Sequence, residues 1–352
     1  MDPRQRFLFG AFFIVDQLPP DRVREFEFGI DLHQWTLDTR FRGFKMIPPG
    51  FHVIHYSSRS RLQRHTFLRH FQAQELLVVR YNTATESFDI CLDGDTVAER
   101  RQQLMEMDAS LAAYPLDAQS EAWPVLTSRI TPPLLIQVVP HLEMTSMTAS
   151  NIPDETGMQV DDKLALQFTP LDLKRSFHNL DVGMDRTRWA QDKSWLLQDI
   201  IQRSVDILGE LQLGFVALLV GQNYEGFEQW KRLIICCCFS QHAQQSPDYQ
   251  PFFCQLVDVL IAQCEAMPKD FFLDMFLGDN FLKKSMKQMY ATAFWDVTLE
   301  DIKRMHELRT KLQTLDTLMS TQFAWPMGAE ALEDEKRKDA EEDEDGPVIV
   351  EL

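Results

Sequence analysis

Two histidines and an Asp-x-His pair are the residues of this chain whose types and spacing could do acid–base or metal chemistry. His52 and His55 stand three residues apart, and Asp31 and His33 stand two apart. Both pairs lie among aromatic and aliphatic residues, a composition typical of β-strands. Because side chains alternate along a strand, His52 and His55 cannot jointly hold one metal ion, whereas Asp31 and His33 could form an acid–base pair. The pair has no nucleophile in register, and we expect both His52 and His55 to be structural or exposed.

The other polar motifs of the chain are incomplete. Asp93 and Asp95 flank Gly94 as in a calcium loop, but the remaining ligands of a twelve-residue loop are missing, so turn and cap residues are the better interpretation. The sequence has no Gly-rich phosphate loop, no Gly-x-Ser-x-Gly elbow and no Cys-x-x-Cys pair. We therefore expect no enzyme activity, no cofactor and no metal. An enzyme whose site is assembled from dispersed residues stays open as an alternative.

The charge of the chain bears on its partners. The formal net charge is -18 over 352 residues, whereas a protein that grips RNA phosphates usually carries a basic face. We favour a solvated surface over an RNA site for one local basic run: Arg59, Arg61, Arg64, His65, Arg69 and His70. The longest apolar runs are too short to cross a bilayer, and without a signal peptide we expect reduced thiols in the cytoplasm or nucleus. A protein-binding factor is thus favoured over an RNA-binding protein.

The first half of the chain has the short runs of a β-rich, sandwich-like domain. Pro48-Pro49-Gly50 is a strong turn signal, so the runs on either side of it are expected to pair as a hairpin. The remaining strands are expected at 6–15, 25–30, 35–37, 75–81, 87–92, 136–139 and 164–168, with 75–81 and 87–92 forming a second hairpin. One helix is expected between a capping box at Thr96 and Glu99 and the residue before Pro115. Residues 141–162 are expected to form a mobile loop.

From about residue 185 the apolar residues recur at three, four and seven, which predicts an all-helical domain of antiparallel helices. Helices are expected at 252–267, 270–276, 282–294 and 299–319, with a loop at 241–251. Residues 330–345 hold ten acidic side chains and no aromatic one, so this stretch is expected to be disordered. The fold class is α+β multidomain, with domains at 1–177 and 182–325 and a tail at 326–352.

Four separated blocks of this sequence resemble the Aar-two family of splicing factors. The block around the Pro48-Pro49-Gly50 turn reads Arg42-Gly43-x-Lys45-Met46-Ile47-Pro48-Pro49-Gly50-x-His52-x-x-His55-Tyr56-Ser57, preceded by Phe28-Gly29-Ile30-Asp31 and Trp35. The later blocks are Asp206–Leu233, then Asp270-Phe-Phe272-x-Asp274 with Asp279–Leu282, and finally Pro347–Leu352. The resemblance covers almost the whole chain in order and is weakest from 116 to 184.

The resemblance implies a holding factor for an immature U5 small nuclear ribonucleoprotein. Such a factor binds the RNase-H-like and Jab/MPN domains of the Prp-eight scaffold protein and keeps the Brr-two helicase from docking prematurely. It works in the cytoplasm and nucleus, and we expect a monomer without membrane or direct nucleic-acid contact. A protein adaptor outside the spliceosome is the alternative.

Two segments are candidate functional sites. The C-terminal run Pro347, Val348, Ile349, Val350, Glu351 and Leu352 is predicted to add as a β-strand to a partner sheet, because β-branched residues favour extended structure. Folding back onto the chain's own β-domain and simple disorder are the alternatives. Ser246, in Ser246-Pro247-Asp248, is a hypothetical regulatory phosphorylation site, with an ordinary proline turn as the alternative.

Overall fold

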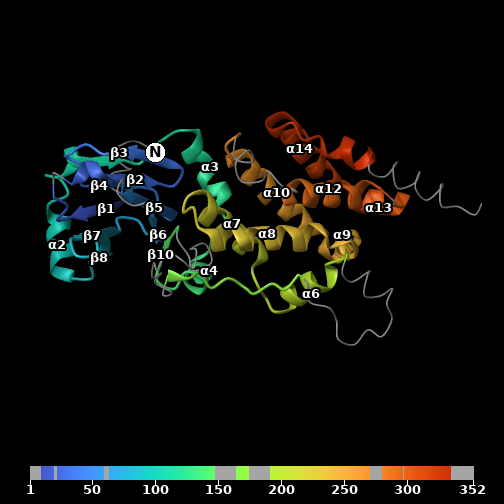
Figure 1. Ribbon diagram of the computed structural model, residues 1–352, viewed down its shortest axis with the longest axis horizontal. Coiled ribbons are helices and arrows are strands. Elements are labelled where there is room, and N and C mark those ends of the chain that lie inside the picture. Colours follow the sequence, from blue (N-terminus) through green and yellow to red (C-terminus); the bar gives the residue numbers. More distant parts are fainter. Residues whose placement is uncertain are drawn as a thin grey trace, which may run out of the picture. The chain divides into compact units, whose positions relative to one another are not determined.

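The structure is a computed structural model, shown in Figure 1. It describes residues 9–19, 22–58, 63–146, 164–173, 191–269, 280–295 and 297–333. The chain divides into two compact units, the first comprising Met1–Gln167 with Leu213–Phe227 and the second Phe168–Gln212 with Glu228–Leu352.

The described residues of the first unit form two five-stranded sheets, in agreement with the expected β-rich, sandwich-like domain. Most of their strands are labelled in Figure 1. One sheet has the order β8-β7-β1-β4-β9, with the pairs β1–β7 and β4–β9 parallel. The other has the order β10-β6-β5-β2-β3 and is antiparallel throughout. The strands are β1 Ala11–Asp16, β2 Phe26–Ile30, β3 His33–Thr36, β4 Gly43–Ile47, β5 Gly50–Ser58, β6 Arg64–Phe71, β7 Leu76–Asn82, β8 Ser87–Ile90, β9 Leu111–Ala113 and β10 Glu143–Thr145.

Aromatic side chains from both sheets form the core between them. Phe13 of the first sheet has its ring centroid 6.3 Å from that of Phe28 and 6.1 Å from that of Phe67 in the second. Phe44 and Ile47 both belong to this core although they stand at positions i and i+3. A regular strand would point them to opposite faces, but the pairing of β1 with β4 shifts register here and Met46 has φ +62°. The irregularity lets both side chains face inward.

The hairpin expected around Pro48-Pro49-Gly50 is wrong. β4 and β5 lie in different sheets, so the turn carries the chain from one sheet to the other. A turn signal reports only that the chain changes direction, and the sheet that each strand joins depends on distant partners. The second expected hairpin is confirmed, because β7 and β8 pair from Val79 with Ile90 to Asn82 with Ser87.

The expected long helix up to Pro115 is also wrong. Helix α2 spans Gly94–Gln102, and its N-cap is Asp93 rather than Thr96. A short 3-10 turn, η2 (Asp108–Ser110), and strand β9 follow. Leu104 and Leu111 nevertheless pack in one cluster with Phe12 and Val78. In the sequence, Val97, Leu104, Met107, Leu111 and Tyr114 recur at the spacing of one helix face. The first four pack in this cluster although no continuous helix carries them, whereas Tyr114 packs in the core between the sheets.

Further differences concern the end of the β-domain. Residues 136–138 belong to helix α4 (Pro132–Val138), which begins with two prolines after an N-cap at Thr131, and the described residues of 164–168 contain no strand. A second unexpected helix, α3, spans Ala118–Leu126, so the described β-domain has three helices instead of one. β10 lies within the expected loop 141–162, of which 147–162 lie outside the described residues.

The expected helical half of the chain is confirmed. Its described elements are α6 Ser194–Gln202, α7 Ile207–Leu219, α8 Tyr224–Cys238, α9 Gln241–Gln245, η6 Pro247–Tyr249, α10 Gln250–Ala266, α12 Phe281–Phe294, α13 Leu299–Arg304 and α14 His306–Phe323. A short 3-10 turn, η1 Val23–Glu25, belongs to the β-rich half. The expected loop 241–251 instead holds α9 and η6, and the expected helix 299–319 breaks at Met305. Residues 270–279, which include the expected helix 270–276, lie outside the described residues.

Cys236, Cys237 and Cys238 are fully buried in α8, as expected for small core residues. Burial raises the pKa of the Cys236 thiol to about 12, which keeps it protonated. Among the described residues, the helices are too short or too polar to cross a membrane.

Candidate partner-binding pocket and buried polar cluster

Asp31 is the centre of a buried polar cluster. It follows β2 in the left-handed region, with φ +55°. Its Oδ2 atom accepts a hydrogen bond from the Tyr114 hydroxyl at 2.8 Å and lies 2.7 Å from Nδ1 of His52. Its Oδ1 atom accepts the backbone N–H of Val53 at 2.9 Å, and the Asp31 N–H donates to the Val53 carbonyl at 2.7 Å. The carboxylate thus ties the end of β2 to β5 and to the segment after β9.

The acid–base pair that Asp31 and His33 could have formed, and that the lack of a nucleophile disfavoured, does not form. His33 Nε2 lies 2.7 Å from Oδ2 of Asp117, the N-cap of α3. The backbone N–H of Ser120, first, and the contact with His33, second, lower the pKa of Asp117 to about 2. Both members of the proposed pair therefore have other partners, with Asp31 in the core and Asp117–His33 nearer the surface.

His55 is buried, 3% exposed, on the face of β5 opposite to His52. Burial first, and the nearby Arg64 guanidinium second, lower the pKa of His55 to about 3, so the ring is neutral at neutral pH. Since β5 is a continuous strand, His52 and His55 project from opposite faces, as the alternation predicts. Both are structural core residues.

The basic run noted in the sequence is largely committed to contacts within the first unit. Arg64 donates to the carbonyl of Val220 at 2.8 Å and to Oε1 of Gln34 at 2.7 Å. Arg69 pairs with Glu75 at 2.6 Å, and Nε2 of His70 lies 2.5 Å from the carbonyl oxygen of Ile130. His65 stacks on Tyr56. Arg59 and Arg61 lie outside the described residues. The described members therefore stabilise the fold and do not form a free cationic face.

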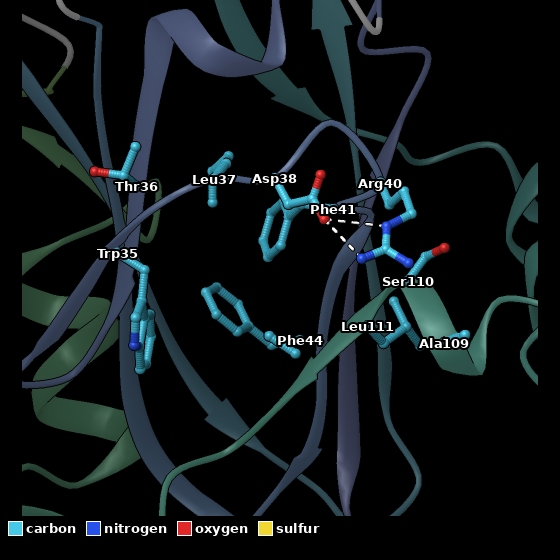
Figure 2. A pocket seen from close by; sticks show the side chains of 11 residues that line it. Trp35, Thr36, Leu37, Asp38, Arg40, Phe41, Phe44, Ala109, Ser110 and Leu111 are labelled. Carbon is cyan, nitrogen blue, oxygen red and sulfur yellow. Dashed lines mark hydrogen bonds and ion pairs between the residues drawn. The ribbon is translucent and has the colours of Figure 1, made fainter.

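A pocket of about 250 Å³, which we call the Trp35 pocket, opens beside Trp35 (Figure 2). The Trp35 ring stacks on His33 with centroids 5.6 Å apart and lies 5.8 Å from the ring of Phe44. Phe41 meets Phe44 edge-on at 5.3 Å. Leu37, Leu111 and Ala112 complete the apolar wall. Phe44 is fully buried, whereas Trp35 is 37% exposed and so remains available for contact.

The walls of the Trp35 pocket include residues from the last strand of each sheet, β3 and β9, together with β4 and the segment between β3 and β4. In the described part of the chain, β3 and β9 each end the strand order of their sheet. At the rim, Nη2 of Arg40 donates to Oδ2 of Asp38 at 2.8 Å, so the two charged lining residues satisfy each other (Figure 2). An apolar pocket beside the last strand of a sheet is the kind of surface on which extended partner segments commonly bind.

The importance of Trp35, Phe41 and Leu111 together was missed at the sequence level. In the sequence, Trp35 belongs to a family-like motif and to a short expected strand, and Leu111 falls within an expected helix. The single available signal was the closely spaced aromatic residues Trp35, Phe41 and Phe44, which by itself indicates core as readily as a pocket. Their joint placement depends on the parallel pairing of β4 with β9.

Of the two candidate segments named in the sequence, the structure describes the one around Ser246 but not the C-terminal run. Ser246 is half-buried at the end of α9, where its backbone N–H donates to the carbonyls of His242 and Ala243. Nearby, Asp192 pairs with the His242 imidazole and accepts the Ser194 hydroxyl at 2.6 Å. Residues 347–352 lie outside the described residues, so their strand addition stays a prediction.

Comparisons with known proteins cover both halves of the chain. Residues 9–140 match the model of the AAR2 N-terminal domain, and residues 168–328 match that of the AAR2 C-terminal repeat region. "Protein AAR2 homolog" of Homo sapiens is 26% identical over 100% of this chain and 97% of the relative. The homologue of Caenorhabditis elegans is 28% identical over 90% of this chain and 94% of the relative. These matches confirm the resemblance to the Aar-two family seen in the sequence blocks, and the chain belongs to the AAR2 family.

Proposed function

We propose that this chain is a pre-mRNA splicing assembly factor that holds the immature U5 small nuclear ribonucleoprotein. It binds the RNase-H-like and Jab/MPN domains of the Prp-eight scaffold and blocks premature docking of the Brr-two helicase. It acts as a monomer in the cytoplasm and nucleus, without an enzymatic step. The observation that carries the proposal is membership, through both domains, of a family of splicing-related proteins.

The chemistry of the described residues supports a binding role. Histidines and carboxylates that might have formed an active site are instead tied into the fold, as Asp31 is by His52 and Tyr114. The Trp35 pocket offers a partly exposed aromatic ring beside two strand edges. Aromatic anchors in apolar pockets commonly dominate the energy of protein interfaces. We assign this pocket to the contact with the scaffold.

The C-terminal run Pro347–Leu352 is proposed as a second contact, made by strand addition to a sheet of the scaffold. Pro347 lacks an N–H and would begin the added strand, and main-chain hydrogen bonds from the following residues would supply affinity. Ile349→Pro removes one donor, so we expect binding to weaken by about 1 to 3 kcal/mol while the monomer melts at an unchanged temperature. If this variant and a chain truncated after Asp345 both bind the scaffold as tightly as the unmodified chain, strand addition is excluded. A lower melting temperature on truncation would support folding back onto the chain instead.

Ser246 is proposed as the site at which phosphorylation releases the scaffold. A phosphate adds about -1.5 to -2 charge. Placed at the junction of α9 and η6, it would compete for the donors that order this turn and lie near the acidic Asp248. Ser246→Glu is expected to bind the scaffold domains more weakly than Ser246→Ala. Equal affinities would remove this residue from the mechanism.

The proposed function is tested with purified components. The chain is mixed with the RNase-H-like and Jab/MPN domains of the scaffold, and increasing helicase is added while the complexes are separated by size-exclusion chromatography. We expect a stable complex of this chain with the scaffold domains. We also expect the helicase and this chain to exclude each other from binding to the scaffold. A complex containing all partners, or no complex at all, would contradict the proposal. Mass spectrometry of proteins that co-purify with the tagged chain from cytoplasmic and nuclear fractions tests the assigned compartments.

A further inference from the structure

A second pocket, which we call the Phe9 pocket, lies elsewhere on the β-domain and shares no lining residue with the Trp35 pocket. Its volume is about 500 Å³. The walls are mainly apolar and are formed by Phe9, Met46, Pro48, Pro49, Tyr114 and Leu116. This size and lining are typical of sites that bind ligands or anchoring side chains.

The walls of the Phe9 pocket are held in place by the fold. The carbonyl of Phe9 accepts the N–H of Gln74 at 3.3 Å, which ties the start of β1 to the turn before β7. Met46 is fixed by the irregularity of β4, and Pro48 and Pro49 have restricted backbones. The Tyr114 hydroxyl is anchored on buried Asp31. A partner would therefore meet a preformed cavity and would not have to order it.

Two large apolar side chains on this pocket are exposed to an unusual degree. Phe9 is 49% exposed and Leu116 is 68% exposed. Burying both against a partner would remove apolar surface from water, which favours association. Clustered exposure of this kind, unlike single exposed residues, indicates an interaction site.

The charge on the pocket selects the occupant. Among the described residues that line the Phe9 pocket, only Glu121, in the first turn of α3, is charged. A carboxylate beside an apolar cavity favours a cation next to a large apolar group. A second copy of this chain would bring the same net charge of -18, and like charges oppose such pairing. A basic partner is therefore favoured over self-association.

We propose that the Phe9 pocket binds a segment of a partner protein in which a large apolar side chain is followed by Arg or Lys. The apolar side chain enters between Phe9 and Leu116, and the cation pairs with Glu121. This site is independent of the Trp35 pocket and does not require the proposed splicing function.

The test uses two short probes with the full chain, N-acetyl-Phe-Arg-amide and N-acetyl-Phe-Glu-amide. The methyl signal of Met46, labelled with carbon-13 and assigned by Met46→Leu, reports on the pocket. At low salt we expect saturable shifts of this signal, with the Arg probe binding about two- to fivefold more tightly, as for an exposed ion pair. Glu121→Lys should reverse that preference. Absence of a saturable Met46 shift with either probe would overturn the site.

Matched variants separate pocket binding from general effects. Leu116→Ser should lose binding of the Arg probe, whereas Ile136→Ser removes an exposed apolar residue of α4 outside the pocket and should retain it. If Glu121→Lys leaves the preference between the probes unchanged, the assigned cation contact is wrong. If Ile136→Ser lowers binding as much as Leu116→Ser, the probe binds elsewhere and the proposal fails.

Discussion

The backbone of Gly29 lies against the ring of His55. A Cβ atom added at Gly29 would stand 2.2 Å from Cε1 of His55 and 2.3 Å from the carbonyl oxygen of His33. The two residues face each other across the antiparallel pair of β2 and β5. Only glycine fits at this position, because the His55 ring and the His33 carbonyl approach its backbone too closely for a side chain. The Gly29 backbone thereby covers the buried His55 ring.

Gly29→Ala is expected to lower the free energy of unfolding by about 1 to 3 kcal/mol or more, because the added methyl overpacks a rigid site. Urea unfolding measures the change. His55→Ala in the same chain should restore only part of the loss, since the His33 carbonyl remains in the way. Gly94→Ala is the control, because a Cβ there has open space. If Gly29→Ala is as stable as this control, the close contact does not exist in solution.

The buried neutral state of His55 should make stability depend on pH. Its pKa is about 3 in the folded chain, against an ordinary value of 6.5. The unfolded chain therefore binds one more proton between these values, so stability falls as pH falls from about 6.5 towards about 3. The slope from this residue is about 1.4 kcal/mol per pH unit. Urea unfolding of His55→Gln at several pH values should show a smaller slope, while His306→Gln, at an exposed position, should keep it. Equal slopes in all three chains would contradict the assignment.

The Asp31 cluster should behave as a coupled unit. The Asp31 carboxylate accepts at three contacts, whereas the amide of Asp31→Asn has a donating NH2 group in place of one accepting oxygen. We therefore expect a loss of about 3 to 5 kcal/mol in unfolding free energy. Tyr114→Phe removes one donor and should cost about 1 to 3 kcal/mol. The double variant should lose less than the sum, because the residues share one hydrogen bond. Tyr224→Phe, at an exposed tyrosine, serves as the control. Additive losses would show that the hydrogen bond is not formed.

Trp35→Ala is expected to weaken binding to the scaffold's RNase-H-like and Jab/MPN domains by about tenfold or more, as for an aromatic anchor. Calorimetric titration measures the affinity, and circular dichroism checks that the chain stays folded. Leu92→Ala removes an apolar side chain that is 91% exposed and lies outside the pocket, so its affinity should be unchanged. An unchanged affinity of Trp35→Ala would remove the Trp35 pocket from the interface.

Local patterns were sufficient where they depended on neighbours in sequence. The apolar period after residue 185 predicted the helices, because one helix face must be buried whatever it packs against. The alternation around His52 and His55 placed them on opposite faces, and Asp93 was correctly assigned as a cap. The four motif blocks also indicated the family that the comparisons show.

Only tertiary structure decided which strands meet. The turn at Pro48-Pro49 looks the same whether it closes a hairpin or joins two sheets, because strand pairing depends on hydrogen bonds to β1, β2 and β6 that come from elsewhere in the chain. Leu111 keeps its helical spacing yet lies on a strand, since burial constrains the face of a side chain and not the backbone that carries it. The Trp35 and Phe9 pockets follow from those pairings, so their residues could not be grouped from the sequence alone.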